Sequence, residues 1–474
     1  MATEQSEMSQ DLVQPYAETD NSVENRKAVS DRIISIHSVT SNRFWQFATL
    51  SAIMFGLGII GLVMRLSSGF DDKQIWGYYV AIFAFLMTTS SAAPMVAIAP
   101  RIANAHWRRP ISRAAEIWTL AGCLNMILYI PLIWVLPSLE NGRRSLWFFG
   151  QQEGVPAYSP HIWATLAIIA LAILGIALLW LSCLPDFALL RDQGNGWRKK
   201  WGGKLALGWR GTTRQWNWQY HRMGVVGAFY FMMLITTHFL FSMDFSMTLV
   251  PGWIDALYPA THAHNSLQAG IAIVLIAMFI LRRFGGYGDY IKYEQFWGLG
   301  KLLFAASLLW FWFWFSSFIV FWYGAKPNEQ GVLELLMVGP YLPVFLVAFT
   351  LNFLVPLFTM MWNPLRRSIW GPTVIAFSVL VGTVFDRVRI YVSSWSVATQ
   401  ENKHLLTEIP SAIKPDVADI LMWLGGISGA ILIYLLATRI IPVVSIWEQK
   451  ELLLYRIHKP FHRLEEVLVL GKKD

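Results

Sequence analysis

The sequence predicts an all-α polytopic membrane protein with about ten transmembrane helices. Of its 474 residues, 55% are hydrophobic and only 14% are charged, whereas a soluble domain carries about 25% charged residues. The apolar residues form repeated runs that are long enough to cross a bilayer as helices. Aromatic residues make up 15% of the chain and include 24 Trp, many of them at the ends of these runs, as in the aromatic belts of membrane proteins.

The chain divides into three parts. Residues 1–43 are polar and of mixed charge, which predicts a flexible cytoplasmic segment. They lack a basic-then-apolar signal pattern, so the first span is expected to insert without cleavage. A ten-helix membrane domain is expected over residues 44–445, and residues 446–474 form a cytoplasmic tail. The expected spans are residues 44–65, 76–100, 112–137, 160–186, 223–246, 264–284, 297–324, 333–361, 367–394 and 417–445.

Basic residues mark alternate loops. Lys and Arg concentrate after the second, fourth, sixth and eighth spans and in the tail, as in Arg198-Lys199-Lys200. By the positive-inside rule both termini are cytoplasmic. The net charge of +8 therefore reports orientation and gives no indication of nucleic-acid binding.

The chain is expected to hold no redox centre of its own. Its two cysteines, Cys123 and Cys183, fall inside apolar spans, and no CxxC or CxxCH pattern offers a zinc, iron–sulfur or c-type haem site. A b-type haem needs paired histidines inside spans. Of the 10 His, only His238 is clearly intramembrane, and His262 and His264 are expected beside a loop.

Ionisable residues near the inner ends of the spans form a first candidate site. Arg113 and Glu116 are three residues apart at the start of the third span, so they can pair. Asp186 closes the fourth span, and Glu294 and Lys301 share one face of the seventh. Two interpretations stay open: boundary ion pairs that pin the helices, or an inner entry route for protons or water.

The outer ends carry a second set. His238 and Asp244 lie on the fifth span, and Asp386, Arg387 and Arg389 lie on the ninth. Asp386 and Arg387 project about 100° apart on a helix, so each is expected to find a partner on another helix. The set is either an interhelical clamp or a charged vestibule for proton transfer.

Only neutral polar groups lie between the two ends. They can hold waters or act as interhelical hydrogen-bonding groups. They are Thr88, Thr89, Ser90, Ser91, Asn125, Thr236, Thr237, Asn352 and Thr383.

Several motifs in this order carry a resemblance to a known family. They are Trp76-Gly77-Tyr78-Tyr79, the stretch Trp107–Glu116, Leu184-Pro185-Asp186-Phe187-Ala188, Ser242-Met243-Asp244-Phe245 with Val250-Pro251-Gly252-Trp253, Asp386-Arg387, and Arg439-Ile440-Ile441-Pro442. From the first span onward the chain resembles the NrfD/PsrC family of quinone-interacting membrane subunits, and within it the larger such subunit of alternative complex III.

The resemblance implies a ten-helix subunit of a bacterial cytoplasmic-membrane complex, with two four-helix bundles. It implies quinol oxidation near the outer face, with menaquinone or ubiquinone as substrate and proton passage at Glu116, Asp186 and Asp244. Haem and iron–sulfur clusters are then expected in partners: an extracytoplasmic iron–sulfur/molybdopterin-like subunit, c-type cytochromes and a second NrfD-like subunit.

One departure from the family pattern concerns the quinone site. Family members tend to carry a histidine at the outer end of the third span, where this chain has Ile133-Trp134-Val135-Leu136-Pro137. A quinol needs a partner for each hydroxyl proton, and Trp134, Glu140 and His161 are the candidates here. The alternatives are a purely structural membrane anchor for a redox partner and a secondary transporter, which would have discontinuous helices around a midplane site.

Overall fold

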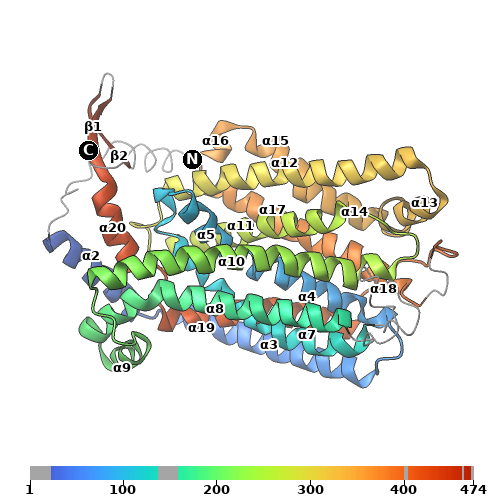
Figure 1. Ribbon diagram of the computed structural model, residues 1–474, viewed down its shortest axis with the longest axis horizontal. Coiled ribbons are helices and arrows are strands. Elements are labelled where there is room, and N and C mark those ends of the chain that lie inside the picture. Colours follow the sequence, from blue (N-terminus) through green and yellow to red (C-terminus); the bar gives the residue numbers. More distant parts are fainter. Residues whose placement is uncertain (1–22, 137–158, 400–403, 462–463, 471–474) are drawn as a thin grey trace.

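Long apolar helices run side by side along one axis of the molecule (Figure 1). The structure is a computed structural model, and it describes residues 23–136, 159–399, 404–461 and 464–470. Within these residues, nine helical stretches are long and apolar enough to cross a membrane. This confirms the all-α polytopic class.

The nine stretches coincide with nine of the ten expected spans. They contain α3 (Asn42–Ser67), η1 (Gln74–Trp76) with α4 (Gly77–Ser90) and α5 (Met95–Ile102), α6 (Ser112–Glu116) with α7 (Trp118–Val135), α8 (Ser159–Gln193), α10 (Thr213–Phe245) with η5 (Met247–Leu249), α11 (Tyr258–Phe284), α12 (Tyr293–Gly324), α14 (Leu342–Phe349) with η7 (Thr350–Leu354) and α15 (Val355–Met360), and α19 (Val417–Ile440).

The remaining expected span, 367–394, is helical as well. It comprises α17 (Trp370–Arg387), the π-helical turn η8 (Val388–Val392) and α18 (Ser393–Ser396), which follow one another without a break. Asp386, Arg387 and Arg389 lie in it, so it is the most charged of the expected spans.

The shorter elements connect the spans or cover their ends. They are α2 (Val23–Ser38), η2 (His106–Arg108), α9 (Gly196–Leu205), α13 (Pro327–Leu333), η6 (Glu334–Val338), α16 (Asn363–Arg366) and α20 (Ile446–Tyr455). Strands β1 (Arg456–Phe461) and β2 (Leu464–Leu470) follow α20 as an antiparallel hairpin, which the sequence did not predict. Helix α2 lies in the segment expected to be flexible, and its Ile33 and His37 are fully buried.

Close helix packing builds the interior. Every residue of α4 is buried, and this helix contacts α7, α11 and α19. Helix α3 lies along α19, where Gly58 and Gly425 meet: a Cβ on Gly58 would stand 2.4 Å from the Cα of Gly425. Small residues of this kind let membrane helices approach closely.

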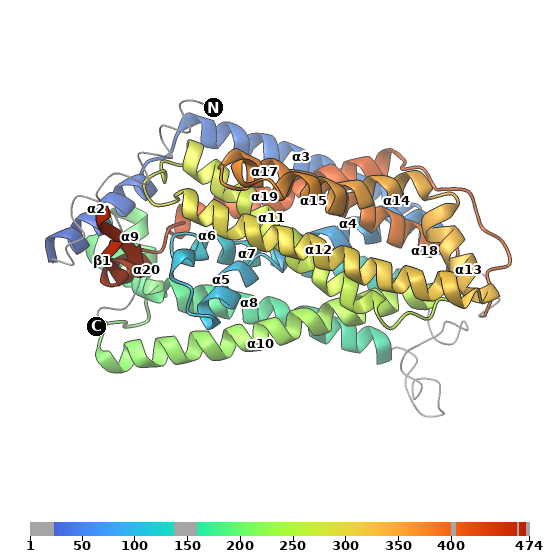
Figure 2. The ribbon, with the colours of Figure 1, turned by 90° about the horizontal axis from the view of Figure 1, so that it is seen from above.

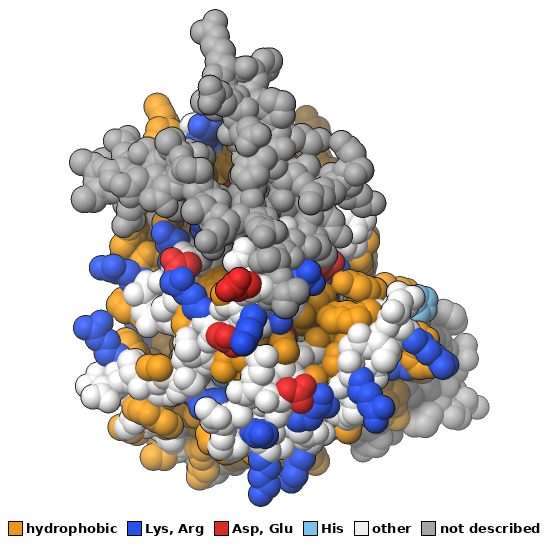
Figure 3. Space-filling view, turned by 90° about the vertical axis from the view of Figure 1, so that its left-hand side faces the viewer, with side chains coloured by type: hydrophobic (Ala, Val, Ile, Leu, Met, Phe, Trp, Pro, Cys, Tyr) orange, Lys and Arg blue, Asp and Glu red, His pale blue; other side chains and the backbone are white. Residues whose placement is uncertain are grey.

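The two ends of the molecule differ. At one end lie α2, α9 and α20, and at the other α13 and α18 (Figures 1 and 2). Lys and Arg side chains gather on the first end (Figure 3), which we call the basic face; the other is the opposite face.

One span is interrupted in its middle. Between α4 and α5 the chain turns at residues 91–94, and the freed Ser91 carbonyl accepts a hydrogen bond of 2.6 Å from the Tyr230 hydroxyl. A non-helical turn is tolerated inside a membrane only where the protein itself surrounds it. In another span the π-helical turn η7 joins α14 to α15 without a gap.

Candidate functional site

Six charged side chains form a buried ionic cluster at the basic face. They come from α5, η2, α6, α8 and α20, so residues far apart in the sequence meet here. Five of the six are less than 9% exposed as residues. The members are Arg101, Arg108, Arg113, Glu116, Asp186 and Glu448.

Three arginines and three carboxylates alternate in this cluster. Arg101 Nη2 lies 2.7 Å from Glu116 Oε1 and 3.3 Å from Glu448 Oε1. Arg108 Nη1 lies 2.6 Å from the same Glu448 oxygen. The three positive and three negative charges balance, as burial of so many charges requires.

Arg113 joins the two predicted acids. Its Nε lies 3.6 Å from Glu116 Oε2, which confirms the predicted pairing, and its Nη2 lies 3.1 Å from Asp186 Oδ2. Asp186 also accepts hydrogen bonds from the backbone N–H of Trp447 at 3.1 Å and the hydroxyl of Ser445 at 3.2 Å. The tail therefore takes part in this site, which the sequence did not indicate.

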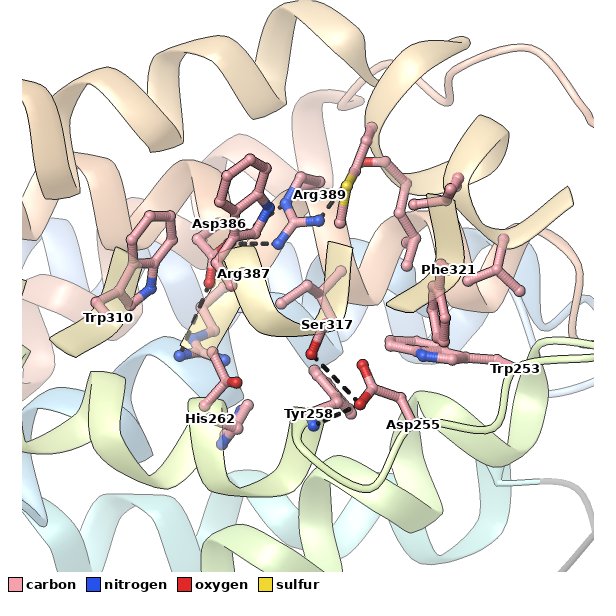
Figure 4. Close-up of a pocket in the computed structure, with 17 residues that line it drawn as sticks. Trp253, Asp255, Tyr258, His262, Trp310, Ser317, Phe321, Asp386, Arg387 and Arg389 are labelled. Carbon is pink, nitrogen blue, oxygen red and sulfur yellow. Dashed lines mark hydrogen bonds and ion pairs between the residues drawn. The ribbon is translucent and has the colours of Figure 1, made fainter. Parts of the chain in front are cut away.

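A pocket lies near the opposite face, between α11, α12, η6 and α17–η8 (Figure 4). Its empty space amounts to about 610 Å³, including the part open to the exterior. Aromatic side chains such as Trp253, Trp310 and Phe321 form much of the wall, and charged groups face it from two sides. The charged side chains and the imidazole are those of Asp255, His262, Asp386, Arg387 and Arg389.

The pairing of Asp386 differs from the prediction. Its partner is on the same helix: Asp386 Oδ1 lies 2.7 Å from Arg389 Nη2, while Arg387 Nη2 is 4.0 Å from the other carboxylate oxygen. Residues three apart share a helix face, a possibility that the prediction did not consider. Arg387 does reach another helix, where it donates to Asn265 of α11.

Asp255 lies on the loop before α11 and faces the pocket from the side of the opposite face (Figure 4). It accepts hydrogen bonds from the backbone N–H groups of Leu257 at 2.8 Å and Tyr258 at 3.1 Å, and from Ser317 Oγ at 3.4 Å. Burial is the largest influence and raises the pKa of Asp255, although these bonds partly oppose it. Asp255 was not among the candidate residues predicted from the sequence.

His238 and His262 face each other across α10 and α11, which corrects the expectation that only His238 lies inside a span. Their Nδ1 atoms are 3.1 Å apart, and the Tyr391 hydroxyl lies 2.8 Å from His262 Nε2. Only one of the two facing Nδ1 atoms can carry the shared proton, so one imidazole donates this hydrogen bond and the other accepts it. Two histidines that ligate one haem iron lie on opposite sides of the iron. The direct contact between His238 and His262 therefore does not fit the ligation of a b-type haem.

Neutral polar groups occupy the middle of the membrane domain in two places. In one, Gln268 Nε2 donates to Ser307 Oγ at 2.9 Å and to the Asn352 carbonyl at 3.0 Å. The other is a small cavity between α4, α7, α8 and α10, whose empty space amounts to about 340 Å³ including the part open to the exterior. Its polar lining consists of Ser91, Thr119, Asn125, Tyr230 and Thr237.

The other candidates lie outside these sites or outside the described residues. Glu294 and Lys301 are exposed, and the Lys301 ammonium lies 3.9 Å from the Trp297 ring centre. Trp134 is 62% exposed. Glu140 and the side chain of His161 fall outside the described part of the chain, so the predicted quinone-binding set cannot be assembled.

Asp244 lies at the end of α10 and is 1% exposed. Its carbonyl accepts a hydrogen bond of 3.2 Å from the Thr248 hydroxyl. It lies about two helical turns along α10 from His238, on the side toward the opposite face.

A comparison with protein families finds one match. The family described as polysulphide reductase, NrfD, matches residues 66–398. This range includes both candidate sites apart from Glu448. No curated protein matches the chain. The match covers well over half of the sequence, and the chain therefore belongs to the NrfD family of polysulphide reductase membrane proteins.

Proposed function

We propose that the chain is an integral membrane subunit of a quinol-oxidising electron-transfer complex of the alternative complex III type, and that it conducts protons between the two faces. Family membership supports a role beside redox subunits. The order of motifs from Trp76 to Pro442 supports the closer assignment. The proposed setting is the bacterial cytoplasmic membrane, with both termini cytoplasmic.

The observation that carries the proposal is the succession of buried polar groups between the faces. The Thr119 hydroxyl donates to the carbonyl of Glu116 at 2.8 Å and also lines the polar cavity. Thr237 lines the same cavity, and its neighbour in the chain, His238, contacts His262. His262 in turn lines the pocket at the opposite face.

The histidine pair can pass a proton without acquiring a net charge. In the resting arrangement His262 carries its proton on Nδ1 and donates it to His238 Nδ1, while its Nε2 accepts from Tyr391. Passage of one proton adds a proton to the Tyr391 oxygen, moves the former hydroxyl proton to His262 Nε2 and the His262 Nδ1 proton to His238 Nδ1, and releases the proton of His238 Nε2. Both rings are neutral before and after this transfer. Water in the polar cavity would complete the route toward Glu116.

Redox centres in this proposal belong to partner subunits. These are an extracytoplasmic iron–sulfur/molybdopterin-like protein, c-type cytochromes and a second NrfD-like subunit. Menaquinone or ubiquinone would supply the electrons and protons. Quinone contact by this chain through Trp134, Glu140 and His161 remains part of the proposal.

A structural anchor is the second candidate. The ionic cluster favours it, because its charges are balanced in pairs and tie α20 to the spans. A secondary transporter would have interrupted helices, and the break at residues 91–94 fits that expectation. The family match, however, includes this break.

The test uses the complex that copurifies with the chain, reconstituted in liposomes and driven by quinol. Tyr391→Phe keeps the ring and removes only the hydroxyl on His262, so the fold should be retained. We expect proton translocation per electron to fall, because a positioned proton-transfer group contributes about 10²–10⁴-fold to the rate of proton transfer. Thr236→Val, at an exposed position of α10, is the control.

An unchanged proton-to-electron ratio in the Tyr391→Phe complex would contradict the proton route. The structural anchor would then be the function that remains. Absence of haem and iron–sulfur subunits from the purified complex would contradict the wider assignment. The two results are separate, because the first is measured on an assembled complex.

A further inference from the structure

One stretch of the basic face is strongly and uniformly positive. Residues 193–222 contain seven Lys and Arg and no Asp or Glu. They form α9, the turn after it and the start of α10, and most of their cations are exposed, including Lys199, Lys200 and Lys204. We call residues 196–222 the basic–aromatic surface. Basic side chains gather on this face of the molecule (Figure 3).

Exposed tryptophans alternate with these cations. Trp197, Trp201 and Trp218 are 45%, 49% and 50% exposed. Each lies beside a cation of the same stretch: the Lys204 ammonium is 5.3 Å from the Trp201 ring centre, and the Arg222 guanidinium is 4.6 Å from that of Trp218. Three half-exposed indoles are unfavourable at a surface that faces only water. They are favourable in the headgroup region of a membrane, where an indole has both apolar and polar surroundings.

The surface is held in place by the spans beneath it. Gly202 packs so tightly on the end of α8 that a Cβ there would stand 2.8 Å from the Phe187 carbonyl oxygen. The Trp180 indole N–H donates to the Leu205 carbonyl at 3.2 Å. Gln215 and Thr212 form a capping box at the start of α10. The cations are therefore presented on a fixed frame.

We infer that the basic–aromatic surface binds the headgroups of anionic phospholipids. It follows the end of α8 at Gln193 and includes the first turns of α10, which starts at Thr213, so it lies where two spans leave the membrane. The phosphodiester charge complements the cations, and the indoles occupy the headgroup depth. Leu207, which is 71% exposed, favours a lipid over an acidic protein, because it would reach toward acyl chains.

The binding site goes beyond proton conduction and does not depend on it. Its test is a titration of the purified full chain in detergent with phosphatidylglycerol, and separately with phosphatidylcholine, followed by native mass spectrometry. Each Lys or Arg at an anionic membrane surface changes affinity about fivefold. We therefore expect the double variant Lys199→Gln, Lys200→Gln to raise the Kd of the tightest phosphatidylglycerol about twentyfold.

The matched control is Lys326→Gln with Lys414→Gln, two exposed lysines of the opposite face, which should leave that Kd unchanged. A second test pair, Arg210→Gln with Arg214→Gln, should reproduce the effect of the first pair. Equal affinity of the native chain for the two lipids would overturn the inference. So would an unchanged Kd in both test pairs, or an equal loss in the control.

Discussion

Glu448 provides the sharpest test of how the tail is fixed to the membrane domain. Its carboxylate is fully buried, and its Oε1 atom lies 2.6 Å from Arg108 Nη1 and 3.3 Å from Arg101 Nη2. Burial alone would raise its pKa, but the two arginines outweigh burial and lower the pKa from 4.5 to about 2. The variant Glu448→Gln removes the charge while keeping the size of the side chain.

The magnitude follows in two ways. A folded-state pKa near 2 against 4.5 in the unfolded state corresponds to about 3 kcal/mol of stabilisation at neutral pH. Removing one member of a buried ion pair costs about 3–5 kcal/mol. Because the folded pKa is the lower one, this stabilisation is complete above pH 4.5 and is lost as the pH falls toward 2.

Limited trypsin cleavage measures the effect. Lys450 lies in α20 and is only partly exposed, so cleavage after it reports the population in which α20 has left the cluster. A loss of about 3 kcal/mol raises that population roughly a hundredfold. Glu451→Gln is the control, since Glu451 pairs with Arg109 at 3.2 Å at a more exposed position. Native cleavage kinetics in Glu448→Gln would refute the electrostatic account.

Three further changes test other parts of the structure. Asp244→Asn should lower proton-coupled turnover of the intact complex if this buried acid conducts protons; normal turnover and proton release would exclude that role. Asp386→Ala should destabilise the chain by about 3–5 kcal/mol, because a buried arginine loses its carboxylate, and an unchanged melting temperature and yield would count against the clamp. Gly58→Val should separate α3 from α19 and lower the melting temperature, since its Cβ would meet Gly425 at 2.4 Å, whereas Gly56→Val has no atom within 4 Å and should be neutral.

The spans were predictable because their signal is local. An apolar run long enough to cross a bilayer must become a helix there, and nine of the expected spans coincide with helices of suitable length and composition. The pairing of Arg113 with Glu116 was also predictable from their spacing. These features need no knowledge of which helices are neighbours.

Contacts between distant segments were not predictable. Glu448 lies more than 300 residues from Arg101 and Arg108, and nothing in the tail sequence indicates a buried carboxylate. His262 was missed for a different reason. Helix α11 begins at Tyr258, but its first turns carry polar residues that face the bundle. Because these residues lower the average hydropathy, the sequence predicted a loop there. A polar residue that faces protein rather than lipid is thus hidden from a hydropathy argument.

The two candidate sites differ in how easily an acid could exchange a proton. Glu116 and Asp186 lie within 4 Å of arginine nitrogens, and their protonation would leave a buried arginine without its counter-charge. In the described part of the chain, no ion pair joins Asp255 to a Lys or Arg. Burial raises its pKa, and it lines the pocket that His262 also reaches. Asp255 is therefore better placed to exchange a proton with the opposite face than Glu116 and Asp186 are to exchange one with the basic face. At the basic face, the tail would have to move away from the ionic cluster first.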